Sequence, residues 1–214
     1  LIDCMEFMKT VPDKYYELAI VDPPYGIGDF EMKTSGGKVK GKCNVMPVVW
    51  NENIPDENYF KELLRISQNQ IIWGANYYNC FSKNGGAYIW YKNIGHNSLS
   101  QCEIASVSFR RNVGYFEFKK LTGFVTKEIY IHPCQKPVEV YKDLLQNYAK
   151  PNDKIFDSHV GSGSSRIACY DLGFDFEGCE LDAGYWQAQE DRFKTHINQS
   201  ELFDKSEIQE LIYK

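Results

Sequence analysis

Short apolar runs alternate along the chain with segments whose apolar residues recur every three or four positions. The runs cover residues 18–21, 71–73, 87–90 and 155–156, and most are followed by polar or turn-forming residues. Such runs predict strands that are buried on both faces, as in parallel sheets. The segments between them have helical spacing. One helix is predicted to begin at Pro55-Asp56, and another to run from Ala183 to about Ile197. This alternation predicts an α/β fold with a doubly wound, mostly parallel sheet and helices on both faces.

The first apolar run stops abruptly at Asp22, Pro23, Pro24 and Tyr25. Strand ends of this kind are where α/β sheets place their chemistry. The prolines have no backbone donors, so the carbonyl groups here stay out of ladder and helix bonds and can face a ligand. With the Asp22 carboxylate beside them and an aromatic face, they would suit a planar ligand that carries an amino group. A plain Pro-Pro turn after a strand is the structural alternative.

A second motif follows the apolar run at residues 155–156. It consists of Asp157 and a Gly-Ser-Gly turn, Gly161 to Gly163, which opens a helical segment. This order is typical of a strand, loop and helix that bind a nucleotide. The next predicted strand, residues 174–179, ends at Glu180, where a carboxylate can accept both hydroxyl groups of a ribose. We expect the strands that end at Asp22 and Asp157 to be neighbours at the centre of the sheet.

Together these segments resemble the β group of amino-methylating DNA methyltransferases, which modify adenine N6 or cytosine N4. Residues 22–25 are similar to that family's catalytic motif, and residues 157–163 to its cofactor loop. The motif order is circularly permuted, with the catalytic motif first. Between them, residues 132–137 (His-Pro-Cys-Gln-Lys-Pro) resemble the segment before the helix that flanks the methionine end of the cofactor. The family usually has Pro-Phe after the motif acid, where this chain has Ser158 and His159.

The resemblance implies transfer of a methyl group from S-adenosylmethionine to N6 of an adenine that is flipped out of double-stranded DNA. It implies that Asp22 and the Pro23 carbonyl hold the amino group, with Tyr25 stacked on the base. An acid before Pro-Pro-Tyr is more frequent in adenine enzymes, but cytosine N4 remains an alternative. The resemblance also implies a homodimer. The residues expected to bind the cofactor are Asp157, His159, Gly161, Ser162, Gly163, Glu180, Gln135 and Lys136.

Some side chains have two interpretations. Tyr77 and Tyr78 lie in a segment that resembles a part of the family near the base pocket, yet they could equally fill the core. His159 could touch the ligand or only fill space.

The net charge is -5, but acidic and basic residues are distributed unevenly along the chain. From Asp171 onward 11 acids face 4 bases, whereas the earlier part has 20 bases and 18 acids. Residues 26–54 predict a mobile functional loop, and residues 110–131 a hairpin, which the resemblance implies to be a short target-recognition insert. Residues 32–51 hold four lysines and no acid, and a second basic group lies between Arg110 and Lys127. Both groups could bind phosphates or simply be solvated. The candidate DNA-binding residues are Lys38, Lys40, Lys42, Arg110, Arg111, Lys119 and Lys120.

Composition indicates the number of domains, the cellular location and the state of the cysteines. A chain of 214 residues with 43% apolar content predicts one domain over residues 1–214. Without a long apolar run or a leader we expect a cytoplasmic protein. The seven cysteines include no Cys-x-x-Cys pair, so we expect reduced, mostly buried thiols and no metal site.

Other activities are alternatives to DNA methylation. Arg166 stands where a dinucleotide fingerprint has its third glycine, which disfavours a nicotinamide dehydrogenase. Methylation of RNA or of a protein glutamine, and a catalytically silent DNA-binding subunit with the same fold, remain alternatives.

Overall fold

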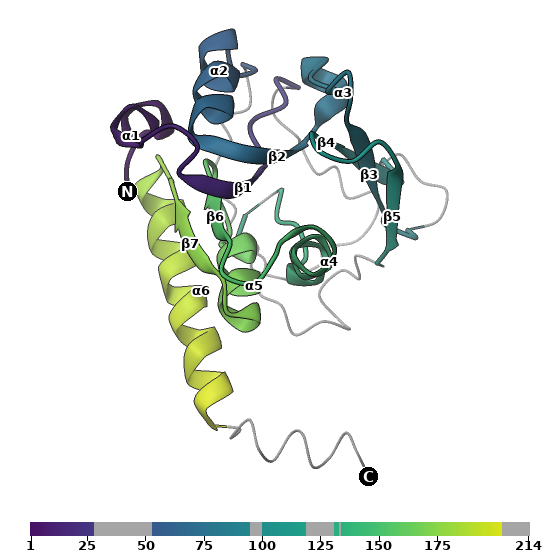
Figure 1. The fold of residues 1–214 in the computed structure, drawn as a ribbon. Coiled ribbons are helices and arrows are strands. Elements are labelled where there is room, and N and C mark those ends of the chain that lie inside the picture. Colours follow the sequence, from purple (N-terminus) through teal and green to yellow (C-terminus); the bar gives the residue numbers. More distant parts are fainter. Residues whose placement is uncertain (28–52, 95–99, 119–130, 133, 203–214) are drawn as a thin grey trace.

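The computed structural model describes residues 1–27, 53–94, 100–118, 131–132 and 134–202, which form a sheet with helices on both sides (Figure 1). In chain order the elements are α1 (Cys4–Thr10), β1 (Tyr16–Val21), α2 (Glu57–Ile66), β2 (Ser67–Trp73), α3 (Ala75–Tyr78), β3 (Gly86–Tyr91), β4 (Cys102–Val107), β5 (Val113–Glu117), α4 (Val138–Tyr148), β6 (Lys154–Asp157), α5 (Ser164–Leu172), β7 (Asp175–Gly178) and α6 (Ala183–Leu202).

The described part of the sheet has seven strands in the order β5-β3-β4-β2-β1-β6-β7. Strand β4 runs antiparallel to both β2 and β3, and the other neighbouring strands pair in parallel. This confirms the predicted mostly parallel sheet. Strands β1 and β6 pair directly, with Leu18 opposite Ile155 and Ala19 opposite Phe156. The prediction that the two motif-bearing strands are neighbours is therefore confirmed.

Two cores cover the two faces of the sheet. Helices α4 and α5 supply Leu144, Leu145 and Ile167 to one core, and α1 and α2 supply Met8 and Leu63 to the other. All five side chains are at most 3% exposed. Burial of this kind contributes roughly 1.5–3 kcal/mol for each large aliphatic side chain. The cores fix the strands, and hence the loops that follow them.

Helix α2 shows how the sequence sets an element. The Asp56 side chain accepts a hydrogen bond from the backbone N–H of Tyr59 and so caps the first turn. Tyr59, Leu63 and Ile66 then follow at helical spacing and are buried. The sequence predicted this start correctly.

Three expectations differ from the structure. Strand β5 pairs in parallel with β3 along its whole length, so it belongs to the central sheet, and residues 119–130 of the predicted hairpin lie outside the described residues. Helix α6 continues to Leu202, beyond the predicted end near Ile197, since residues 198–202 contain no glycine or proline. Of the described cysteines, all free thiols, only Cys169 and Cys179 are buried.

Among the described helices, none combines the length and the apolar character needed to cross a membrane.

Candidate active site

Three carboxylates line one edge of the sheet. Asp22 follows the last residue of β1, Asp157 is the last residue of β6, and Glu180 lies two residues after β7. Because β1, β6 and β7 are parallel neighbours, these residues lie at the same edge, at the carboxyl ends of the strands. The fold thus brings both predicted motifs to one side of the molecule.

The Asp22 carboxylate has a donor on each oxygen. Its Oδ1 accepts a hydrogen bond of 2.6 Å from the Tyr25 hydroxyl. Its Oδ2 lies 2.5 Å from the Lys136 ammonium, whose Nζ is also 3.1 Å from the Tyr25 hydroxyl and 2.9 Å from Glu103 Oε2. Lys136, predicted among the cofactor-binding residues, is therefore placed against the catalytic motif.

Lys136 and Glu103 carry opposite charges that are fixed by their surroundings. Burial acts to raise the pKa of Glu103, but the ammonium groups of Lys136 and Lys92 lower it to about 2. Burial acts to lower the pKa of Lys136, but Asp22 and Glu103 raise it above its ordinary value. Both groups therefore stay charged at neutral pH.

Two tyrosines of α3 complete the catalytic motif. The ring of Tyr25 stacks on Tyr77, with centroids 4.8 Å apart and planes inclined by 16°. The Tyr78 hydroxyl donates to the carbonyl of Pro23 and, at 2.9 Å, to that of Pro24. A carbonyl oxygen has two lone pairs, so each can accept a further bond. Tyr77 and Tyr78 thus contact the motif. Tyr77 is 41% exposed, whereas Tyr78 also packs against the core that includes Tyr59 and Leu63.

Gly74 makes room for this arrangement. It has a φ of +72°, and a Cβ at this position would lie 2.4 Å from the Tyr25 ring. Only glycine adopts this backbone without strain and lets the ring approach so closely.

The glycine loop after β6 holds the Glu180 carboxylate. The backbone N–H groups of Gly161 and Asp182 each donate to a different Glu180 oxygen, both at 2.9 Å. Each oxygen keeps capacity for a further donor. Gly163 has a φ of +77° and precedes α5, and the Ser162 and Ser164 hydroxyl groups lie 3.1 Å apart.

Two side chains that were predicted to contact the cofactor make hydrogen bonds within the loops around the site. Asp157 is 1% exposed and accepts hydrogen bonds from the His159 backbone N–H at 3.0 Å and the Ser165 hydroxyl at 2.6 Å. Gln135 is 2% exposed and accepts from the Ile131 N–H at 3.1 Å. Both side chains brace the loops around the site.

His159 lines a cavity of about 340 Å³ together with Pro24, Met5 and Asn58. Its Nδ1 lies 2.8 Å from the Ser158 hydroxyl, which lies 2.6 Å from the Tyr59 hydroxyl. Where the family usually has proline and phenylalanine, this chain therefore has a hydrogen-bonded pair of polar side chains. The cavity wall at this point is polar.

Asp157 and His159 should give opposite dependences of stability on pH. Burial raises the pKa of Asp157 from 3.8 to about 7. Between these two pH values the folded chain binds more protons than the unfolded chain, so this group's contribution to the free energy of unfolding falls as pH rises. Burial lowers the pKa of His159 from 6.5 to about 4. Between these two pH values the unfolded chain binds more protons than the folded chain, so this group's contribution to the free energy of unfolding falls as pH falls. In the wild type the two effects oppose each other.

We therefore expect opposite slopes from two variants in urea unfolding between about pH 4.5 and pH 6.5. Asp157→Asn removes the carboxylate, so its unfolding free energy should fall on acidification relative to the wild type. His159→Phe removes the imidazole, so its unfolding free energy should rise on acidification relative to the wild type. Equal slopes in the two variants would contradict the assigned pKa shifts.

Few of the predicted DNA-binding residues can be placed. Arg110 and Arg111 are exposed, and the Arg110 guanidinium lies 5.0 Å from the centre of the Tyr148 ring and donates to the Asn147 carbonyl. The predicted mobile loop, apart from its ends, and the lysine candidates lie outside the described residues, namely Lys38, Lys40, Lys42, Lys119 and Lys120.

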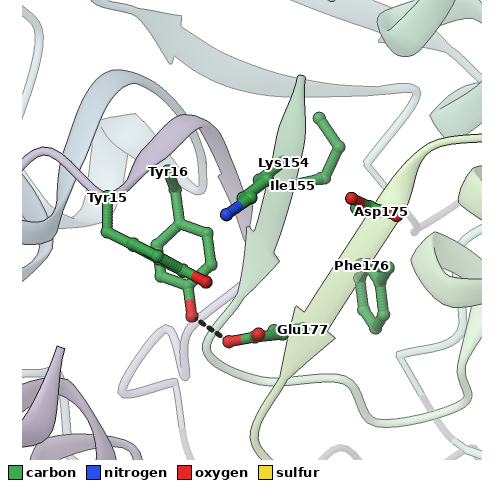
Figure 2. A pocket seen from close by; sticks show the side chains of 7 residues that line it. All are labelled: Tyr15, Tyr16, Lys154, Ile155, Asp175, Phe176 and Glu177. Carbon is green, nitrogen blue, oxygen red and sulfur yellow. Dashed lines mark hydrogen bonds between the residues drawn. The ribbon is translucent and has the colours of Figure 1, made fainter. Parts of the chain in front are cut away.

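A second cavity, of about 300 Å³, lies at the opposite edge of the sheet, where β1, β6 and β7 begin (Figure 2). The Tyr16 hydroxyl donates to Glu177, and the Lys154 ammonium lies 4.1 Å from the centre of the Tyr15 ring. Neither predicted motif contributes to this cavity, so it is separate from the candidate active site.

Sequence reasoning missed Glu103, Lys92 and the contact between Lys136 and Asp22. One signal was present: Glu103 is an acid at the start of a strand whose later residues, Ala105 to Val107, are buried. A charge so close to a buried strand needs a partner.

The sequence has known relatives. The family model described as DNA methylase matches residues 75–191. Type II methyltransferase M1.MboII from Moraxella bovis is 33% identical, over 86% of this chain and 91% of its own length.

Two solved structures share the fold. An M1.HpyAVI–SAM complex has a TM-score of 0.54 at 18% identity, covering 89% of this chain and 96% of that one. PvuII DNA methyltransferase, described as cytosine-N4-specific, has a TM-score of 0.58 at 10% identity, covering 93% and 90%. With its two motifs at one sheet edge, this chain belongs to the N6/N4 family of DNA methylases.

Proposed function

We propose that the protein transfers a methyl group from S-adenosylmethionine to N6 of an adenine flipped out of DNA. The observation that carries this proposal is the meeting of the Asp-Pro-Pro-Tyr motif and the Gly-Ser-Gly loop at the ends of paired strands β1 and β6. We propose that one domain, residues 1–214, carries the activity, with residues 110–131 reading the target.

The groups around the glycine loop fit S-adenosylmethionine. Glu180 is held by two backbone donors and keeps an accepting lone pair on each oxygen, which suits the two ribose hydroxyl groups. Gly161 and Gly163 lack a Cβ and have positive φ, so the backbone can approach the ligand closely. When bound, the cofactor supplies an electrophilic methyl group on a positively charged sulfur. The M1.HpyAVI structure, which shares the fold, is a complex with SAM and supports the same cofactor for this chain.

The catalytic motif would hold the amino group of the base. The Asp22 carboxylate and the Pro23 carbonyl each accept one N–H, which draws the nitrogen lone pair out of conjugation with the ring. Tyr25, supported by Tyr77, stacks on the base. The Tyr78 hydroxyl fixes the prolyl carbonyl groups in place. Catalysis then rests on positioning and electrostatics, without a cysteine nucleophile.

The amino group is paired inside a duplex, so the nucleotide must leave the stack at a cost of a few kcal/mol. Contacts to phosphates offset this cost and make binding dependent on salt. Exposed Arg111 is a described candidate for such a contact, together with the lysines of residues 32–51 and 119–127.

Adenine is supported by Asp22, since an acid precedes Pro-Pro-Tyr more frequently in adenine enzymes. Cytosine N4 is the second candidate because the cytosine-specific PvuII enzyme has a similar fold. The fold alone does not separate the two bases.

Mass spectrometry of methylated nucleosides tests the proposal directly. The protein is incubated with methyl-labelled S-adenosylmethionine and a mixture of duplex oligonucleotides, and with RNA of the same sequences as a control. We expect N6-methyladenine in the DNA alone. N4-methylcytosine would overturn the base assignment, and label in RNA or in the protein would overturn the substrate.

Glu180→Gln tests the cofactor site separately. The amide places a donor where an acceptor is needed, so we expect cofactor affinity to fall about tenfold by calorimetry. Unchanged affinity would place the ribose elsewhere.

A further inference from the structure

A largely buried ion cluster links Asp22 to strand β4. The Lys136 ammonium lies 2.5 Å from Asp22 Oδ2 and 2.9 Å from Glu103 Oε2, and its side chain is 3% exposed. On the other side of Glu103, Oε1 lies 2.7 Å from the Lys92 ammonium. The cluster joins Asp22 to Lys136 just before α4, to Glu103 on β4 and to Lys92 just after β3.

The charges in this cluster balance. Asp22 and Glu103 contribute two negative charges, and Lys136 and Lys92 two positive ones. A buried pair contributes little net stability compared with apolar residues, whereas removing one partner leaves an uncompensated charge. Such a cluster is better explained by a need for defined geometry than by stability.

The cluster orients the carboxylate that the proposed reaction needs. Tyr25 binds Oδ1 and Lys136 binds Oδ2, so two donors on different oxygens fix the carboxylate plane. A carboxylate has about four lone-pair sites, so these two bonds leave accepting positions for an amino group. Lys136 cannot move freely, because Glu103 holds it and its ammonium lies 4.9 Å from the centre of the buried Trp73 ring.

We propose that Lys136 and Glu103 are positioning residues for Asp22: Lys136 aligns the carboxylate, and Glu103 holds Lys136. This inference rests on the proposed function. It gives Lys136 a role toward the base-binding side of the site, in place of the predicted contact with the cofactor. Lys92 is the outer member of the cluster and stabilises Glu103.

Lys136→Met tests the assignment, with Lys142→Met as a matched control. Lys142 lies on α4 and pairs with Asp171 at 2.6 Å, away from the catalytic motif. We expect Lys136→Met to lower kcat at least about tenfold while cofactor affinity stays within about threefold. Lys142→Met should keep the wild-type kcat. A Lys136→Met variant with wild-type kcat, or with cofactor affinity as its main loss, would overturn the proposal.

Two further variants separate alignment from mere folding. Lys136→Arg keeps the charge and should recover part of the lost kcat, and Glu103→Gln should lower kcat less than Lys136→Met does. An Arg variant no better than the Met variant would contradict alignment by charge.

Nuclear magnetic resonance of ¹⁵N-labelled lysine side chains tests the pairing without turnover. The Nζ signal assigned to Lys136 should shift in Asp22→Asn and in Glu103→Gln, while the Lys142 signal stays in place. If the Lys136 signal does not shift in Asp22→Asn, the pairing of Lys136 with Asp22 is wrong. If the wild type transferred no methyl group to DNA, the proposed function would fail, and these signals would still decide whether Lys136 holds Asp22.

Discussion

Asp22→Ala should lower kcat for methyl transfer by about 10³-fold, because the amino group of the base loses its charged acceptor. The carboxylate lies at the end of β1, where it is 14% exposed and bound by Tyr25 and Lys136. The cofactor loop follows β6 and does not use Asp22 for its hydrogen bonds. Cofactor affinity should therefore stay within about threefold of the wild type, as measured by calorimetry.

Asp171→Ala is the matched control for this variant. Asp171 is also a partly buried acid with a lysine partner, since it pairs with Lys142 and His196 and is 19% exposed. Its loss should lower stability and leave kcat unchanged. Normal turnover by Asp22→Ala at saturating cofactor would remove Asp22 from the catalytic role.

Gly74→Ala should lower kcat by about 10²-fold through a displaced ring. The added Cβ would lie 2.4 Å from Tyr25 Cε1 and 2.7 Å from its Cδ1, so the ring has to move. Tyr25 both stacks on Tyr77 and donates to Asp22, so the displacement disturbs both contacts. A misplacement of about 1 Å is enough for a loss of this size. Kinetics at saturating cofactor and DNA measure it.

Gly173→Ala separates this effect from backbone strain. Gly173 has a φ of +76°, close to the +72° of Gly74, but apart from its chain neighbours no atom of the described residues lies within 4 Å of its added Cβ. Both variants should lose about 1–2 kcal/mol of unfolding free energy from the left-handed backbone. Gly173→Ala should keep its kcat. An equal loss of kcat in both variants would mean that stability, and not the position of Tyr25, limits activity.

The sequence predicted those parts of the site that depend on local order. A buried run followed by an acid gives a strand end, and parallel neighbours bring such ends to one edge, so the approach of Asp22 and Asp157 followed from the pattern. The Asp56 cap and the helix start at Ser164 were also local signals.

The contacts that depend on long-range packing were not predictable in the same way. Lys136 is 114 residues from Asp22 in the chain, and its sequence neighbours do not indicate which carboxylate it meets. Residues 110–131 mix basic, aromatic and β-branched residues around Gly114 and Gly123, which favours a hairpin locally, but pairing with β3 decides the place of β5. Gly74 indicated only a turn in the sequence. The reason why it has no side chain is the ring of Tyr25, 49 positions earlier, which occupies the space.

Reversal of β4 within an otherwise parallel sheet has an evolutionary consequence. Because this strand runs the other way, its first residues, Cys102 and Glu103, pair with the last residues of β3 and lie at the catalytic edge. A fully parallel arrangement admits only residues that come after a strand to that edge. Substitutions in the first residues of β4 can therefore change the surroundings of Asp22 without any change in the loops after β1, β6 and β7, which is a separate evolutionary route to an altered site.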